Sequence, residues 1–121
     1  MRIAVIGASA NRDKFGNKCV RAYLSAGHKV FPVNPKEKTI EGLVCYKSIS
    51  EIKERIDAVS LYLLPSAGKD VVDNIISKKP EIVYMNPGTE DEDIEEKLKK
   101  NSIKAIKQCS IRAIGINPEE I

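Results

Sequence analysis

Five residues in the segment IAVIGASANRDKFG, residues 3–16, are of the types that could together hold a phosphate: Gly7, Ala8, Ser9, Arg12 and Lys14. The first three have little side chain, so a phosphate could approach their backbone amides closely. The two cations could neutralise its charge, and a helix N-terminus after them would add its dipole. The segment therefore predicts a phosphate-binding turn, with a solvated loop edge as the plainer interpretation of the two cations.

The turn after the second apolar run bears on which nucleotide this site would take. A site that binds NAD has an Asp or Glu at the end of the second strand, where it binds the ribose hydroxyls. This chain has Asn34-Pro35-Lys36 there, with a cation in place of the acid. Lys36 would attract a phosphate beside the ribose, unless it is simply an exposed lysine. The pattern disfavours NAD and leaves NADP as an alternative.

Residues that could perform catalysis are few. Acid–base chemistry would need a His or paired carboxylates among the turns that carry the site. The single histidine, His28, follows a predicted helix end, away from that edge. Cys109 is the candidate nucleophile, but the sequence shows no base to activate it, and a packed, inert cysteine is the commoner role. We therefore expect a binding protein rather than an enzyme.

Composition disfavours several other classes of function. The 121 residues suffice for one domain, and 42% hydrophobic with 31% charged residues is ordinary for a globular protein. The first 50 residues carry 9 Lys and Arg against 3 Asp and Glu, so positive charge is concentrated in the half with the Gly7 turn. Only 5% of the residues are aromatic and there is no Trp, so we expect a small anionic ligand rather than nucleic acid.

Neither a membrane nor a metal is expected as a partner. No apolar run approaches the length of a membrane span, and the first strand begins too close to Met1 for a signal peptide, so we expect a cytoplasmic protein. Cys19, Cys45 and Cys109 are widely spaced. They form neither a disulfide framework nor a metal-binding pair.

Strands and helices are expected to alternate along the chain. Short apolar runs predict buried strands at 3–6, 29–33, 58–64, 82–85 and 103–106. Apolar residues at helical spacing predict helices between them, one ending at Gly27 and one beginning after Ser66. Capping boxes predict two more helix starts, at Ser48 with Glu51 and at Thr89 with Glu92.

Three smaller features of local structure are predicted as well. Pro32 cannot donate to a strand ladder, which indicates a bulge or a strand end. Residues 44–46 are expected to pair briefly as a strand. The tail SIRAIGINPEEI, residues 110–121, is apolar enough to dock as an extra strand or to contact a partner.

This alternation predicts an α/β fold: a single Rossmann-like domain over residues 1–121, with a doubly wound, mainly parallel five-stranded sheet and helices on both faces. In such sheets, ligands bind at the carboxyl ends of the strands, where the strand order reverses. That rule selects four turns: residues 7–16, 34–36, 64–67 and 86–89.

The order of motifs resembles a known family. IAVIGAS, VFPVNPK, LYLLP and YMNPG, followed by Cys109, resemble the small stand-alone coenzyme A-binding domain proteins. These are similar to the CoA-binding domain of the succinyl-CoA synthetase alpha subunit. The resemblance spans the chain from Ile3 to about Cys109 and implies a Rossmann-like fold that binds CoA.

The resemblance also implies roles for particular residues. Those that would meet the phosphates of CoA are Gly7, Ala8, Ser9, Arg12 and Lys14, and the turn beside the nucleotide would be Pro35-Lys36. The turns along the pantetheine arm would be Leu64, Pro65, Met85, Asn86, Pro87 and Gly88, with Cys109 near the CoA sulfur. Members of the family often have a Pro near the position of Arg12, and the phosphorylated His of the synthetase lies outside this domain.

The sequence thus predicts a protein that binds CoA or an acyl-CoA at the carboxyl edge of its sheet, without catalysis of its own. Two other functions stay open: an NADP-binding module of the oxidoreductase type, and a degenerate Rossmann domain that serves as a protein-interaction scaffold. A homodimer or another protein partner is compatible with all three.

Overall fold

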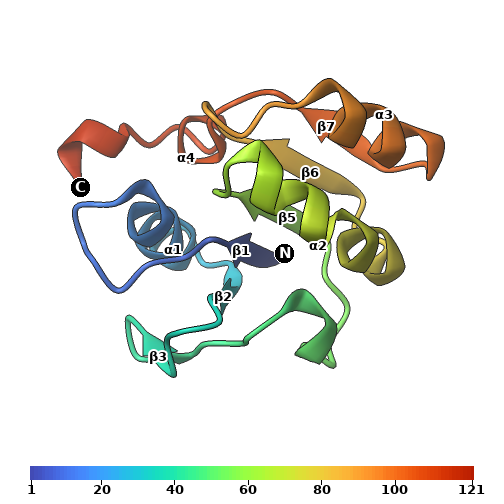
Figure 1. Ribbon diagram of the computed structural model, residues 1–121. Helices are drawn as coiled ribbons and strands as arrows, with labels where there is room; N and C mark the ends of the chain where they lie inside the picture. Colours follow the sequence, from blue (N-terminus) through green and yellow to red (C-terminus); the bar gives the residue numbers. More distant parts are fainter.

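Five parallel strands form the central sheet of the computed structural model, which describes residues 1–121 (Figure 1). Their order across the sheet is β2-β1-β5-β6-β7. The strands are β1 (Arg2–Ile6), β2 (Lys29–Val33), β5 (Ala58–Leu61), β6 (Ile82–Met85) and β7 (Lys104–Ile106). All five predicted strands are present. The third ends at Leu61 rather than at residue 64, because the next residues turn into a helix whose first residue is Pro65.

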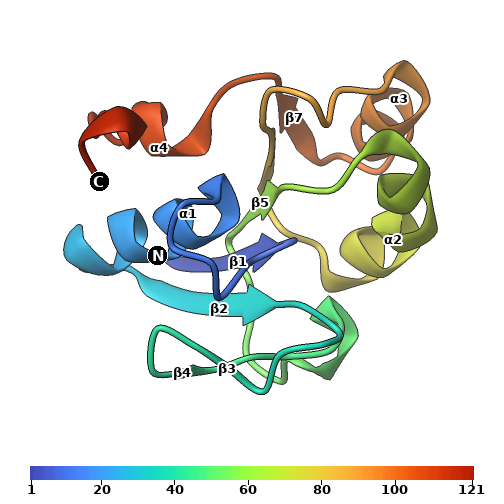
Figure 2. The ribbon, with the colours of Figure 1, turned by 60° about the vertical axis from the view of Figure 1, so that its left-hand side comes forward.

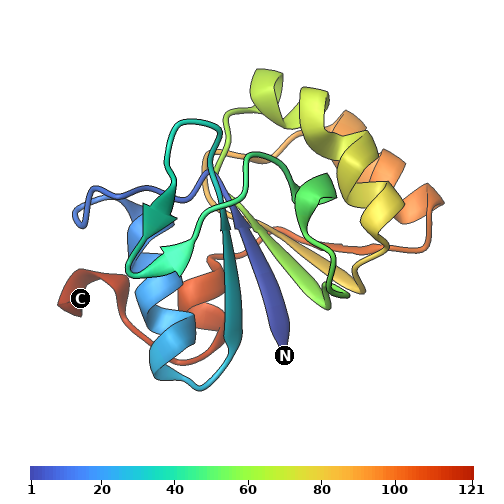
Figure 3. The same cartoon turned by 90° about the horizontal axis from the view of Figure 1, so that it is seen from below.

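Helices cover both faces of this sheet, as Figure 3 shows. One face carries α1 (Phe15–Ser25) and α4 (Ser110–Ala113), and the other carries a 3₁₀ turn, η1 (Ile49–Glu51), with α2 (Pro65–Lys78) and α3 (Glu92–Lys100). A hydrophobic core lies on each face of the sheet, and alternate side chains of the central strands point into one core or the other. In β1, for example, Ile3 and Val5 belong to the core on the α1 side, and Ala4 and Ile6 belong to the core on the α2 side. The predicted doubly wound α/β fold is confirmed. No helix of the structure is long and apolar enough to span a bilayer.

The strand order places a topological switch between β1 and β5. From β1 the chain crosses through α1 to β2 on one side, and then returns past β1 to β5 on the other side. The crossovers that leave the carboxyl ends of β1 and β5 therefore go to opposite faces of the sheet. This divergence opens the edge where ligands bind in such folds.

A short hairpin flanks the outer edge of β2 (Figure 2). It pairs β3 (Thr39–Ile40) with β4 (Leu43–Val44), and Tyr46 then bridges to Val33, so the predicted pairing near residues 44–46 is present. Pro32 causes no bulge, because the register of β2 with β1 is continuous, but the strand does end one residue later, at Val33. Lys29 donates its N–H to the Met1 carbonyl, so alternate residues face β1 and the Pro32 nitrogen faces away from it.

Both predicted capping boxes are wrong. Ser48 makes no side-chain cap, and Glu51 Oε2 accepts from the Lys47 amide at 2.9 Å instead, so only one 3₁₀ turn forms. At α3 the N-cap is Asp91, whose Oδ2 accepts from the Ile94 amide at 3.1 Å. Thr89 is turned inward and donates its hydroxyl to the Asn86 carbonyl at 2.7 Å, so it belongs to the preceding turn.

The tail forms helical turns and not an extra strand, which was one of the two roles predicted for it. After β7 the chain enters α4 and then a 3₁₀ turn, η2 (Pro118–Glu120), and both lie against α1. Ile111 is fully buried in the core under α1, and Lys18 Nζ donates to the Pro118 carbonyl at 2.8 Å. Ile114 and Ile116 pack partly buried against the same core, whereas Ile121 at the end of the tail is exposed.

A buried ring of hydrogen bonds joins β5, the end of β6 and the start of α4. Asn86 Nδ2 donates to Ser60 Oγ at 2.9 Å, and Ser110 Oγ donates to Asn86 Oδ1 at 3.1 Å. The two serine oxygens are 2.7 Å apart. Because the amide oxygen can only accept, the Ser110 proton goes to Asn86, and Ser60 must donate to Ser110.

The remaining groups around this ring are also paired. Asn86 Nδ2 donates to the Leu61 carbonyl at 2.9 Å, and Asn86 Oδ1 accepts from the Ser110 amide at 2.8 Å. Cys19 Sγ donates to Ser60 Oγ, and the hydroxyl of Tyr62 lies 3.3 Å from Ser110 Oγ. The Asn86 side chain has therefore used all of its hydrogen-bonding groups within the protein.

We expect Asn86→Ala to lower the free energy of unfolding by about 2–4 kcal/mol, because it leaves buried groups on β5 and α4 without their hydrogen-bond partner. Asn101→Ala is the matched control: Asn101 is exposed and its side chain makes one hydrogen bond, to the Lys97 carbonyl. Its substitution is expected to cost less than about 1 kcal/mol. Urea unfolding of both variants measures the difference, and equal losses would contradict the role assigned to the ring.

Candidate functional site

The loop after β1 is in backbone contact with both β5 and α1. Gly7 has a φ of 87°, and a Cβ there would lie 2.5 Å from the Tyr62 carbonyl oxygen. A Cβ on Gly16, in the first turn of α1, would lie 2.4 Å from the Gly7 carbonyl oxygen. Both positions therefore require glycine. The second glycine permits the close helix–strand packing that the last glycine of G-x-G-x-x-G provides, at a different spacing.

Some of the backbone amides that the sequence suggested for ligand binding in this loop are already bonded within the protein. Gly7 and Ala8 donate their N–H groups to the Val33 carbonyl, at 3.1 and 3.2 Å, and so are occupied. The amides of Ser9, Ala10 and Arg12 make no hydrogen bond within the chain. A phosphate could therefore meet the loop from Ser9 onward.

Two asparagines hold the loop in this shape. Asn34 Nδ2 donates to the Ala8 carbonyl at 2.8 Å, and Asn17 Nδ2 donates to the Ser9 carbonyl at 2.9 Å. Neither of these roles was predicted from the sequence. Asn34 belongs to the VNPK motif, where its residue type indicated a turn. Asn17 gave no signal, because a polar residue in a helix is ordinarily exposed, whereas this one is fully buried.

A first cavity of about 460 Å³ opens at this edge, on the α2 side of the sheet. Its apolar lining includes Ile6, Val33 and Leu63, and it brings together three predicted site residues. These are Gly7, Pro35 and Lys36. Its polar lining also includes Asn34, from the predicted turn of residues 34–36, and four residues that the sequence did not assign to a site: Lys47, Ser48, Asp70 and Asn74.

A second cavity of about 200 Å³ opens on the α1 and α4 side. It contains three further predicted residues, Asn86, Pro87 and Cys109. The other lining residues are Phe15, Tyr62, Arg112, Pro118 and Glu119. Because Gly7 lines the first cavity and touches the backbone of Tyr62, which lines the second, the two cavities flank one contact at the switch point.

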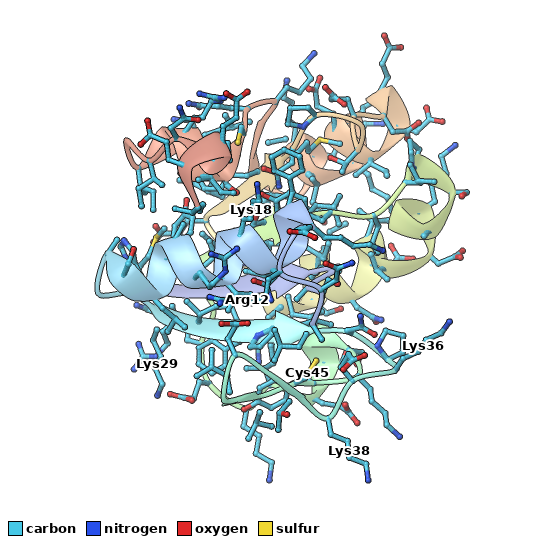
Figure 4. All side chains as sticks on the ribbon, turned by 90° about the vertical axis from the view of Figure 1, so that its left-hand side faces the viewer. Arg12, Lys18, Lys29, Lys36, Lys38 and Cys45 are labelled. Carbon is cyan, nitrogen blue, oxygen red and sulfur yellow. The ribbon has the colours of Figure 1, made fainter.

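The other predicted residues lie outside both cavities. Arg12 and Lys14 are exposed, and Arg12 Nε lies 3.5 Å from Glu41 Oε2. Figure 4 shows Arg12 between α1 and β2, and Lys36 beyond the end of β2. The residues that line neither cavity are Ala8, Ser9, Arg12, Lys14, Leu64, Pro65, Met85 and Gly88. Met85 is fully buried in the core and Leu64 is largely exposed, so their contact with a ligand stays a prediction.

The three cysteines are free but differ in their surroundings. Burial raises the pKa of the Cys19 thiol and of the Cys45 thiol. Cys109 is only half-buried and lines the second cavity. Burial also raises the pKa of the Tyr62 hydroxyl, so Tyr62 remains a neutral hydrogen-bond donor in the wall of that cavity. The chain contains no group of three His, Cys, Asp or Glu side chains arranged to hold a metal ion.

Among curated proteins, the chain is similar to part of much longer ligases. It is 28% identical to the ADP-forming acetate–CoA ligase I of Archaeoglobus fulgidus over 117 residues, which are 95% of this chain and 17% of the ligase. It is 25% identical over 111 residues to the uncharacterised protein YneT of Bacillus subtilis, covering 92% of this chain and 82% of that protein. The chain thus spans about a sixth of the ligase and most of the small protein.

Solved structures have the same architecture. A conserved hypothetical protein from Pyrococcus furiosus is 33% identical, with a TM-score of 0.85 over 93% of this chain and 97% of that one. A dinucleotide-forming acetyl-coenzyme A synthetase of Ca. Korarchaeum cryptofilum shares the fold, with a TM-score of 0.76 at 24% identity over 89% of this chain and 25% of that one. The family model described as the CoA binding domain matches residues 1–115. The chain therefore belongs to the CoA binding domain family.

Proposed function

We propose that this protein binds coenzyme A, free or acylated, along the carboxyl edge of its sheet. The observation that carries the proposal is the pair of cavities on either side of the Gly7–Tyr62 contact, at the point where the strand order reverses. The 3′-phosphoadenosine end occupies the first cavity and the pantetheine arm runs into the second. Membership of the CoA binding domain family supports this choice of ligand.

The chemistry of the first cavity suits the nucleotide end. An adenine ring needs apolar contact on its faces and a few polar groups at its edge. Apolar contact with the ring can come from Ile6, Val33 and Leu63. Hydrogen bonds from an amino group or from ribose hydroxyls can be accepted by Asp70 and Asn74. Lys36 and Lys47 line the same cavity and form no ion pair within the protein, so both are available to a phosphate.

The second cavity suits the uncharged arm and its sulfur. Phe15, Tyr62 and Pro87 offer apolar contact, and Cys109 lies where the thiol end would arrive. The proposal assigns binding roles to these residues and a catalytic role to none. It also assigns the protein to the cytoplasm, where free thiols such as the three of this chain persist.

Calorimetric titration with CoA, acetyl-CoA, NAD and NADP tests the proposal directly. We expect CoA to bind and NAD to bind much more weakly, because the turn after β2 has a cation, Lys36, where a site for NAD has an acid. Melting temperature should rise with CoA, since the ligand binds the folded state alone. Tighter binding of NAD or NADP than of CoA would assign the cavity to a dinucleotide instead.

Lys36→Ala is expected to weaken CoA binding by about 1–3 kcal/mol, through loss of a charge-assisted hydrogen bond to phosphate. The loss should shrink with dephospho-CoA if Lys36 contacts the 3′-phosphate. Lys38→Ala is the matched control, because Lys38 is exposed, lies outside the cavity and changes the net charge equally. If the two variants have similar affinities for CoA, Lys36 is a surface lysine that does not contact the ligand.

Cys109 offers a test of where the CoA sulfur lies. A Cys109 thiolate near that sulfur attacks one sulfur of CoA disulfide, forming a Cys109–CoA mixed disulfide and releasing one CoA thiolate. We expect mass spectrometry to find the adduct on Cys109 and not on buried Cys19 or Cys45, and to find none in Cys109→Ser. An adduct on another cysteine, or on none, would contradict the placement of the pantetheine arm.

A further inference from the structure

Glu41 has a backbone conformation that its side chain disfavours. It occupies the two-residue turn between β3 and β4, with a φ of 50°, and is followed by Gly42 with a φ of 76°. Turns with two positive φ values favour Asn, Asp or Gly, because other side chains crowd the backbone there. A residue held in such a conformation is a reason to examine what its side chain contacts.

The Glu41 carboxylate reaches from the hairpin to the loop after β1. Its Oε2 accepts a hydrogen bond from Asn17 Nδ2 at 3.1 Å and lies 3.5 Å from Arg12 Nε. The Glu41 side chain is 23% exposed, and Asn17 is fully buried. The contact is therefore largely shielded from water on the Asn17 side.

This contact completes a network around the loop of residues 8–14. Asn17 Nδ2 also donates to the Ser9 carbonyl at 2.9 Å, and Arg21 Nε donates to Asn17 Oδ1 at 2.7 Å. Arg21 Nη2 donates to the Arg12 carbonyl at 2.8 Å. The loop is thus held from α1 at both Ser9 and Arg12, and Glu41 is the group that ties this network to the hairpin.

We propose that Glu41 is a positioning residue, which holds the 8–14 loop so that its unpaired amides face the ligand's phosphates. This inference rests on the proposed function. The amides of Ser9, Ala10 and Arg12 already lack partners in the chain, so a fixed loop presents them without reordering when the ligand arrives. In this arrangement the Arg12 side chain lies beside Glu41, and its backbone amide faces the ligand.

Glu41→Gly separates positioning from stability. Glycine accepts the positive φ without strain, which offsets the lost hydrogen bond, so the melting temperature should change little. Binding of CoA, by calorimetry, should weaken about tenfold because the loop must be ordered on binding. Glu41→Gln keeps an acceptor for Asn17 and should stay within about threefold of the wild type, since the exposed Arg12 ion pair contributes little.

Lys79→Gly is the matched control. Lys79 follows α2 as its C-cap, with a φ of 54°, so glycine relieves a similar strain there, far along the chain from the loop. It should leave CoA affinity unchanged. If the wild type binds CoA, either of two results would overturn the inference. One is a CoA affinity of Glu41→Gly equal to that of the wild type, and the other is a loss of affinity in Glu41→Gln as large as that in Glu41→Gly. Absence of CoA binding by the wild type would instead overturn the proposed function, and this inference with it.

Discussion

The hydrogen-bonded ring of Ser60, Asn86 and Ser110 is the constraint on which the carboxyl edge of this sheet depends. It connects a buried position on β5, the turn after β6 and the first residue of α4. Buried polar groups of this kind are costly unless all are paired, so the three elements can come together in one arrangement only. Cys109 precedes Ser110, and the ring therefore also places the thiol that lines the second cavity.

A second constraint is steric and acts at the same edge. Gly7 and Gly16 allow the β1 loop to touch both β5 and α1 at distances that no Cβ would permit. The Gly7 and Ala8 amides of this loop donate to the Val33 carbonyl of β2, so the amides without a partner lie further along the loop. The contact of Gly7 with the backbone of Tyr62 lies between the two cavities of this edge.

Local patterns predicted the strands and the longer helices well, because burial on both faces leaves continuous apolar runs and burial on one face leaves helical spacing. Boundaries and caps were predicted less well. Thr89 and Asp91 are both good N-cap residues, and the choice between them depends on Asn86, whose carbonyl takes the Thr89 hydroxyl. The tail gave an apolar signal without a period, so its docking on α1 could not be derived from it.

The sequence by itself determined the layered α/β architecture, the turns that meet at the carboxyl edge of the sheet and the position of Lys36 at that edge, because each follows from strand order or from chain continuity. Only the tertiary structure decided that Asn86 serves the fold, that Arg12 pairs with Glu41, and that Lys47 and Asp70 share a cavity with Lys36. These are contacts between residues more than ten positions apart. Side-chain direction and burial decide them, and neither leaves a periodic signal in the chain.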